Sequence, residues 1–305
     1  MTYPSIIDAI GNTPLVELGR VSDILGLEGR LLAKLDYLNP GFSKKDRAAK
    51  ATIEAARASG ALAEGQVVVE LTSGNMGTGL AIVCGVLGHP FVAVMSKGNS
   101  EERARMMRSL GAKVVLVPQA AGSKPGEVSG ADLALVEAEA QRITAERGAF
   151  RADQFERPEN TAAHEHGTAP EIWEQSGGAV TAFCDFVGSG GTLGGCARYF
   201  ATKGVRCYAV EPDMAEHPIQ GGGYDMPDLT HLKGVSLAGR ETVSGKDAAD
   251  HARMLARAEG IFGGYSAGAN LAAAIRLLQG PEKGGAVAFV VCDSGLKYLS
   301  TDLWS

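Results

Sequence analysis

Residues 67–87 read VVVELTSGNMGTGLAIVCGVL and place a strand, a short loop and a helix in direct succession. The apolar, β-branched stretch at 66–71 predicts a buried strand, and residues 75–87 predict a helix. The loop between them, Thr72-Ser73-Gly74-Asn75-Met76-Gly77, consists of small residues around the expected helix start. A helix N-terminus of this kind favours an anion such as a carboxylate, although an ordinary Ser or Asn helix cap would give the same pattern.

The same strand–loop–helix alternation continues along the chain. Further strands are expected at 91–94, 114–117, 181–187 and 286–291, and further helices at 44–58, 100–110, 130–147, 247–259 and 266–279, with another from about 192. This alternation is typical of an α/β fold with parallel sheets. Two such blocks, roughly 40–148 and 180–295, predict two α/β domains. The Gly/Ser/Pro-rich stretch 119–130 is expected to be an exposed loop.

The composition is that of a globular chain with an excess of glycine. Of 305 residues, 41 are glycine, 45% are hydrophobic and 21% are charged. A net charge of −6 argues against nucleic-acid binding. The longest apolar run, 80–95, is interrupted by Gly, His and Pro, so we expect no membrane span, and the N-terminus lacks a signal-peptide pattern. The five cysteines form no CxxC motif, which favours buried free thiols in a reducing, cytoplasmic environment.

A glycine-rich motif, Gly188-Ser189-Gly190-Gly191-Thr192, follows the expected strand at 181–187. Glycines allow the backbone to wrap an oxyanion, and the dipole of the following helix favours its negative charge. The motif lacks the Gly-Lys-Ser/Thr ending of a Walker A loop. Glu211 lies near the place of a ribose-binding acid, but Leu193 breaks the G-x-G-x-x-G dinucleotide pattern. The sequence therefore favours a phosphate-bearing cofactor over NAD.

Gly264-Tyr265-Ser266-Ala267-Gly268 matches the G-x-S-x-G nucleophile elbow of α/β-hydrolases. In that fold the catalytic histidine follows the serine, whereas all six histidines of this chain precede Ser266. The hydrolase interpretation is therefore disfavoured. A metal site is not expected either, because His164 and His166 are spaced i,i+2 and do not share a helix face.

Lys45 lies in the stretch 39–47, which reads NPGFSKKDR. Ser43 is expected to cap the following helix, which places Lys45 in its first turn. The helix dipole disfavours a cation there, so the pKa of the amine should fall and its nucleophilicity should rise. A solvated surface lysine is the simpler interpretation of this motif on its own.

The motifs together resemble the cysteine synthase and cystathionine β-synthase family, fold type II enzymes that use pyridoxal 5′-phosphate (PLP). Five motifs occur in that family's order, namely GNTPL from residue 11, NPxxSxKDR, TSGN, GSGGT and GxSxG, and Asp293-Ser294-Gly295 and 298–301 extend the similarity to the C-terminus. The resemblance implies two α/β domains with PLP in the cleft between them. A smaller domain at 37–149 would close over a larger one formed by 1–36 and 150–305.

The resemblance also implies a role for each motif residue. Lys45, rather than its neighbour Lys44, would bind PLP covalently and remove the substrate's α-proton. The expected cofactor-binding residues are Lys45, Asn75 at the 3′-oxygen, Gly188, Ser189, Gly190, Gly191 and Thr192 at the phosphate, and Ser266 at the pyridine nitrogen. The expected substrate-binding residues are Thr72, Ser73, Gly74, Met76 and Gln154. The segment 221–224 resembles the family's loop near the mouth of the active site.

The implied reaction is β-replacement on L-serine or an O-activated L-serine through an aminoacrylate, most simply cysteine synthesis with sulfide. A neutral Ser266 at the ring nitrogen favours this chemistry over transamination. One alternative is a β-eliminating lyase or dehydratase, and a second is a PLP-binding scaffold without catalysis. Met76 replaces the family's usual Thr, and Lys97 and Asn99 also depart from its pattern, which indicates a donor other than O-acetylserine. The resemblance further implies a homodimer with small-molecule substrates.

Overall fold

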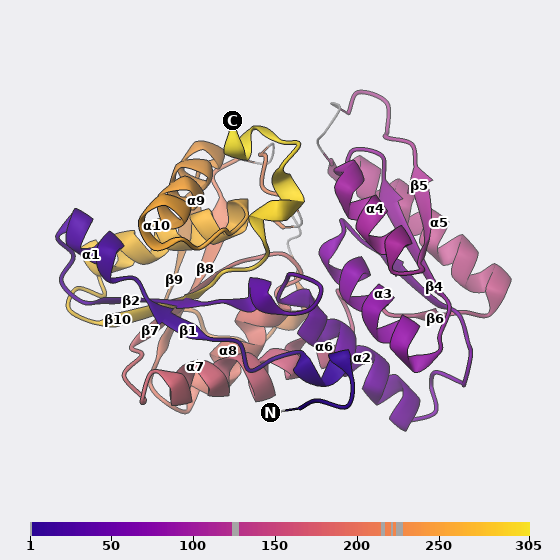
Figure 1. Ribbon diagram of the computed structural model, residues 1–305, viewed down its shortest axis with the longest axis horizontal. Coiled ribbons are helices and arrows are strands. Elements are labelled where there is room, and N and C mark those ends of the chain that lie inside the picture. The colour runs from indigo at the N-terminus through magenta and orange to yellow at the C-terminus, as the bar shows by residue number, and fades with distance from the viewer. Residues whose placement is uncertain (1, 124–127, 215–216, 221, 224–227) are drawn as a thin grey trace.

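The computed structural model describes residues 2–123, 128–214, 217–220, 222–223 and 228–305. It contains two twisted sheets that lie side by side, each with helices on both faces (Figure 1). Residues 124–127 of the expected 119–130 loop, and residues 221 and 224 of the segment expected at the site's mouth, lie outside the described residues.

The larger sheet has six strands in the order β1-β2-β10-β7-β8-β9. Its strands are β1 (Leu15–Glu17), β2 (Arg30–Lys34), β7 (Ala182–Phe186), β8 (Arg206–Pro212), β9 (Gly239–Val243) and β10 (Ala286–Val290). β1 is antiparallel to β2, and the other neighbouring strands are parallel. Every residue of β7 and β10 is buried, as expected for central strands of a parallel sheet.

Helices cover both faces of the larger sheet because successive side chains of a strand point to opposite sides. Cys184 and Phe289 pack with one set of helices, and Phe183 and Ala288 pack with the other set. The first set is α1 (Gly19–Leu25), α9 (Gly245–Glu259) and α10 (Tyr265–Gln279); the second is α7 (Ala169–Gln175) and α8 (Gly191–Ala201). Two short elements, α6 (Pro158–Ala163) and the π-helical turn η3 (His164–Thr168), contact α8.

The smaller sheet has four parallel strands in the order β5-β4-β3-β6. Its strands are β3 (Val68–Leu71), β4 (Phe91–Ser96), β5 (Lys113–Val117) and β6 (Phe150–Arg151). One face packs against α2 (Lys45–Ala58), α3 (Asn75–Leu87) and α4 (Glu101–Ser109), and the other packs against α5 (Gly130–Arg147). Short 3-10 turns complete the chain, namely η1 (Ile6–Ala9), η2 (Asp36–Leu38), η4 (Thr230–Leu232), η5 (Gly295–Tyr298) and η6 (Asp302–Trp304).

The expected α/β class with parallel-type sheets is confirmed. The helices predicted from the sequence begin and end within two residues of the observed bounds. All five cysteines are buried and none forms a disulfide. Among the described residues, no helix is long and apolar enough to cross a membrane, and no group of three or more His, Cys, Asp or Glu side chains could hold a metal ion. The division into 37–149 and 1–36 plus 150–305 stays a prediction.

Candidate active site

Four helix N-termini meet at one cavity between the two sheets. The first residues of α2, α3 and α8 are Lys45, Asn75 and Gly191, and α10 begins at Tyr265, next to Ser266. The cavity is lined by the predicted cofactor residues Lys45, Asn75, Gly188, Ser189, Gly190, Gly191, Thr192 and Ser266. Helix N-termini carry partial positive charge, so the cavity is suited to an anionic ligand.

Lys45 is held in place by backbone pairing with the segment that follows β10. The Lys44 amide donates to the Cys292 carbonyl at 2.9 Å, and Ser43 forms a β-bridge with Asp293. The prediction that Ser43 caps α2 is therefore wrong. Lys44 occupies the cap position without a side-chain cap, because the bridge to Asp293 holds Ser43 in a strand-like pairing instead.

The Lys45 amine is the reactive group that this position was expected to provide. Its Nζ donates to Ser189 Oγ at 3.0 Å. Burial, together with the positive charge of Lys44, lowers the pKa of Lys45 to about 8. A neutral amine is the nucleophilic form, so the site makes Lys45 more reactive than an ordinary lysine near neutral pH.

Lys44, in contrast to Lys45, is held in its protonated state. Its Nζ lies 2.5 Å from Asp185 Oδ2, and both side chains are almost fully buried. Burial opposes the charge of Lys44, but the adjacent Asp185 carboxylate outweighs it and raises the pKa of Lys44 above its usual value. A protonated, ion-paired amine is a poor nucleophile, and this distinguishes the two neighbouring lysines.

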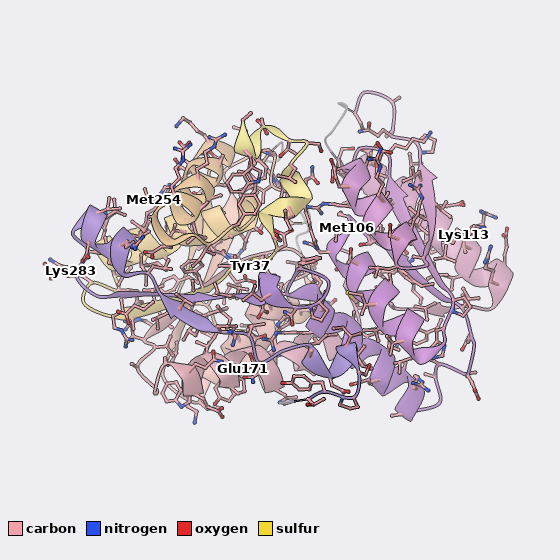
Figure 2. All side chains as sticks on the ribbon, viewed as in Figure 1. Tyr37, Met106, Lys113, Glu171, Met254 and Lys283 are labelled. Atoms are coloured by element: carbon pink, nitrogen blue, oxygen red, sulfur yellow. The ribbon has the colours of Figure 1, made fainter. Side chains whose placement is uncertain are left out.

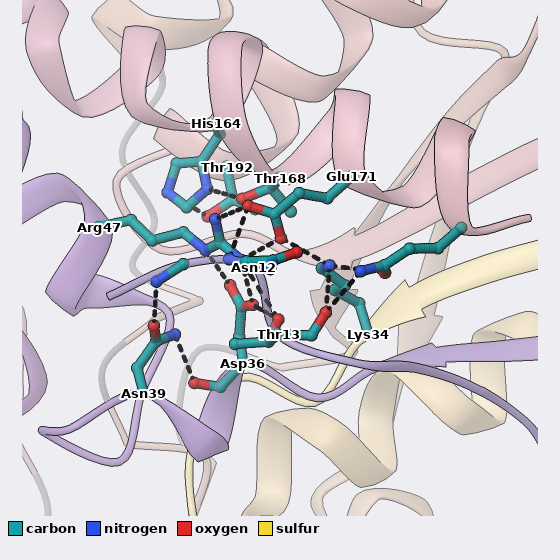
Figure 3. Close-up of polar contacts among 12 residues, drawn as sticks. Asn12, Thr13, Lys34, Asp36, Asn39, Arg47, His164, Thr168, Glu171 and Thr192 are labelled. Carbon is teal, nitrogen blue, oxygen red and sulfur yellow. Dashed lines mark hydrogen bonds and ion pairs between the residues drawn. The ribbon is translucent and has the colours of Figure 1, made fainter. Parts of the chain in front are cut away.

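A buried ionic network anchors the start of α2 (Figure 3). Arg47, two residues beyond Lys45, bonds both oxygens of Asp36, at 3.0 and 2.9 Å. It also bonds both oxygens of Glu171 on α7, at 2.6 and 2.7 Å. Glu171 in turn pairs with Lys34 of β2 at 2.6 Å. Bidentate pairs of this kind fix geometry as well as energy, so the network sets the position from which Lys45 extends.

The glycine-rich loop after β7 is shaped to present hydrogen-bond donors. Gly190 has a left-handed backbone, φ 85°, and a Cβ at Gly191 would lie 2.3 Å from Asn160 Oδ1. Ser189 Oγ accepts from Asn160 Nδ2 at 2.9 Å and from Lys45, which leaves its own O–H to donate elsewhere. Thr192 Oγ1 lies 3.2 Å from His164 Nε2 (Figure 3).

A second cavity adjoins the first and shares Lys45, Asn75 and Ser189 with it. The predicted substrate residues that line it are Thr72, Ser73, Met76 and Gln154. Leu71, Arg103, Leu133 and Phe155 complete the lining. Thr72 Oγ1 accepts from the amides of Gly74 and Gly77 at 2.9 and 3.0 Å, so its hydroxyl proton is available to an acceptor.

Three residues singled out in the sequence, Gly74, Lys97 and Asn99, are not among the residues that line the two cavities. Gly74 caps α3 and packs against the side chain of Arg103, so it shapes the loop without lining it. Lys97 and Asn99 form a turn after β4, where Asn99 Nδ2 bonds the Ser96 carbonyl. Met76, Lys97 and Asn99 all differ from the residues that the family usually carries. Of these three, Met76 is the one that lines the substrate-side cavity.

Comparison with known proteins identifies the chain's relatives. Residues 6–293 match the family model described as pyridoxal-phosphate dependent enzyme. The chain belongs to this family. It is 36% identical to cysteine synthase 3 of Caenorhabditis elegans, over 98% of this chain and 89% of that protein.

Solved structures of the same family superpose on the whole chain. O-ureido-L-serine synthase matches with a TM-score of 0.89 and 35% identity, covering 100% of this chain and 96% of that one. The O-acetylserine dependent cystathionine beta-synthase of Helicobacter pylori matches with a TM-score of 0.91 and 29% identity, covering 100% of both chains. The expected family, PLP dependence and enzyme class are thereby confirmed.

The residues present fit PLP. The glycine-rich loop and the N-terminus of α8 offer donors to a phosphate, and Ser189 keeps a free O–H for it. Lys45 supplies a reactive amine at the same cavity, and Asn75 supplies an amide there. Glu211, placed where dinucleotide folds hold a ribose acid, pairs instead with Arg240.

Sequence reasoning missed several polar residues that organise the site. Asp185, Asn160, His164, Arg103 and Glu70 are all buried. Glu70 accepts from the Asp153 amide at 2.7 Å and from Gln154 Nε2 at 3.3 Å, and burial raises its pKa to about 7. None of these residues belongs to a recognisable motif, and a charged residue within an apolar strand, as at Glu70 and Asp185, was the one available signal.

Proposed function

We propose that this enzyme catalyses β-replacement on an O-activated L-serine, with sulfide or another small nucleophile as the second substrate. One observation carries the proposal. Lys45 lines both adjoining cavities, one suited to a phosphate-bearing cofactor and the other to an amino-acid carboxylate. A single neutral amine can therefore first bind the cofactor and then remove a proton from the substrate's α-carbon.

When bound, PLP supplies the electron sink that acidifies the substrate's α-C–H bond and allows the β-substituent to leave. The chain supplies the proton transfer and the orientation. Lys45 Nζ, neutral in part near pH 8 because of its lowered pKa, takes the α-proton as a general base. The Thr72 hydroxyl and the start of α3 bind the α-carboxylate, where the helix dipole favours a negative charge.

Gln154 is the second proposed clamp on the carboxylate. Its Nε2 uses both N–H groups within the chain, on Glu70 Oε1 at 3.3 Å and on the Leu71 carbonyl at 3.2 Å, so one of these bonds must be released before the amide can donate to a carboxylate. Ser266, at 8% exposure, is the proposed partner of the cofactor's ring nitrogen. A hydroxyl carries no negative charge to hold that nitrogen protonated, which supports replacement at Cβ over transamination.

The substrate-side cavity has an apolar wall that would keep water from the reacting atoms. Leu71, Met76, Leu133 and Phe155 contribute to it. Closure of the proposed 37–149 unit over the remainder of the chain would extend this exclusion. Without it, water would divert the reaction from replacement toward elimination.

A donor panel tests the proposal. Purified PLP-loaded enzyme is given O-acetyl-L-serine, O-ureido-L-serine, O-phospho-L-serine or L-serine, each with and without sulfide, and cysteine and pyruvate are quantified. We expect cysteine from at least one O-activated donor, formed only with sulfide and faster than pyruvate forms without it. Pyruvate at the same rate with and without sulfide, and no cysteine, would replace the proposal with a β-eliminating lyase.

We also propose a homodimer in the cytoplasm whose partners are small amino acids and nucleophiles. The family resemblance supports the dimer, and five free cysteines are in keeping with a reducing compartment. Light scattering of the purified protein tests the oligomeric state, and a mass of one chain would exclude the dimer.

A further inference from the structure

The side-chain amide of Asn75 is held between two charged residues from the C-terminal segment. Asn75 Nδ2 donates to Asp293 Oδ2 at 2.7 Å, and Lys297 Nζ donates to Asn75 Oδ1 at 2.7 Å. Asn75 begins α3, beside the smaller sheet, whereas Asp293 and Lys297 follow β10 of the larger sheet. These two bonds form a clamp on the Asn75 amide that links the two halves of the site.

The charges of the clamp determine which way the amide faces. A lysine ammonium can only donate hydrogen bonds, and a carboxylate can only accept them. A flipped amide would place its NH₂ group against Lys297 and its oxygen against Asp293, losing both bonds. The Asn75 oxygen is therefore fixed toward Lys297, and the second N–H of Nδ2 remains for an acceptor in the cavity that Asn75 lines.

Both halves of the clamp are braced by buried neighbours. Asp293 Oδ2 also accepts from the Tyr298 hydroxyl at 2.8 Å and lies 3.8 Å from Arg103 Nη2. Lys297 Nζ also donates to the Gly41 carbonyl at 2.9 Å. Asp293 and Lys297 are each 1% exposed, and low local polarity strengthens such bonds and makes their loss costly.

Titration of Lys297 would loosen the clamp from one side. Burial and the positive charge of Arg103 lower the pKa of Lys297 to about 8, although the negative charges of Asp293 and Asp46 act to raise it. The positive charge that distinguishes the two ends of the amide is thus present at neutral pH and declines above pH 8.

We propose that Lys297 and Asp293 are positioning residues that orient the Asn75 amide so that an N–H, and not the carbonyl oxygen, faces the ring oxygen of bound PLP. The inference rests on the part of the proposed function that places Asn75 at that oxygen. It gives the C-terminal segment a role in cofactor binding that the motifs do not assign.

The test measures PLP binding without substrate, by the affinity of the cofactor-free protein and by the absorbance band of the bound cofactor. Lys297→Met removes the donor to the amide oxygen and leaves Asp293 alone to orient the amide, and we expect PLP to bind about tenfold more weakly with a shifted band. Lys297→Arg keeps a group that only donates, and should restore both readouts. Lys113→Met, at an exposed lysine on the outer edge of the smaller sheet (Figure 2), is the matched control.

A double variant separates positioning from a general structural effect. If Lys297 acts through Asn75, adding Lys297→Met to Asn75→Ala should weaken PLP binding no further. Additive losses, or wild-type affinity and spectrum in Lys297→Met, would overturn the inference. Should Lys297→Met fail to fold, Asp293→Asn tests the other half of the clamp, because an amide at 293 can pair with either end of Asn75 and leaves Lys297 alone to orient it.

The outcome is distinguishable from that of the proposed reaction. Wild-type PLP affinity and spectrum in Asn75→Ala would overturn the positioning inference while the donor panel still gave cysteine. Failure of the donor panel, with the expected PLP-binding losses intact, would overturn the reaction and leave the clamp supported.

Discussion

Removing one member of the Lys44–Asp185 pair should lower the free energy of unfolding strongly, whereas removing both members together should lower it far less. At 2.5 Å, the attraction between the two charges is about 7 kcal/mol at an effective dielectric constant of about 20, and desolvation offsets much of it. Asp185→Asn keeps the side chain's shape and leaves the buried Lys44 ammonium without its counter-charge. We expect this variant, and equally Lys44→Met, to lose about 3–5 kcal/mol of unfolding free energy.

The double variant, Lys44→Met with Asp185→Asn, removes both charges together and should cost far less than the two single losses added. Urea denaturation of the cofactor-free chain measures these free energies. Both tryptophans, Trp173 and Trp304, lie outside the smaller sheet and its helices, and their fluorescence should change together with circular dichroism if unfolding is cooperative. The exposed pair Lys246–Asp250, given the matching substitutions, is the control and should show little coupling.

Strict additivity of the two single losses would refute this account of the pair. Single variants whose free energy of unfolding lies within about 1 kcal/mol of the wild-type value would also refute it, because an unpaired buried charge is expected to cost several times as much. Either result would also remove the reason for treating Lys44 as a protonated, unreactive neighbour of Lys45.

Three further predictions concern the cofactor site. Arg47→Met should lower the urea midpoint and weaken PLP binding by about tenfold or more, and Arg47→Lys should not restore either, because one ammonium cannot replace the bidentate pairs. The rate at which the cofactor-free chain takes up PLP should rise about fivefold from pH 7 to pH 8, because the neutral fraction of a Lys45 amine with a pKa of about 8 rises by that factor. Stopped-flow absorbance measures this rate, and a rate that does not depend on pH would contradict the prediction. Gly191→Ala, whose Cβ would lie 2.3 Å from Asn160 Oδ1, should reduce PLP affinity in a fluorescence titration, whereas Gly19→Ala, which has open space, should not.

Much of the fold was predictable because its signals are local. Apolar β-branched runs and helical stretches alternate with short loops, and the TSGN and GSGGT loops each follow a strand, so the pattern predicts α/β layers and the sheet edges where a ligand binds. The motif residues Lys45, Asn75 and Ser266 consequently line one cavity, as the resemblance implied.

The polar framework behind those motifs was not predictable, because it depends on pairs far apart in the sequence. Lys44 and Asp185 are 141 residues apart, and Asn75 and Lys297 are 222 apart. A charged residue within an apolar run signals a buried partner without saying which residue that partner is. The error at Ser43 has the same origin, since a local capping rule could not anticipate its bridge to Asp293.

Chemical trapping of the bound cofactor tests the central claim most directly. The PLP-loaded enzyme is reduced with borohydride, which makes the link between cofactor and lysine permanent, and the modified residue is located from peptide fragment masses. The structure predicts the reduced cofactor on Lys45, which lines both cavities. The same modification on Lys44, or on a lysine outside the cavity, would contradict the account.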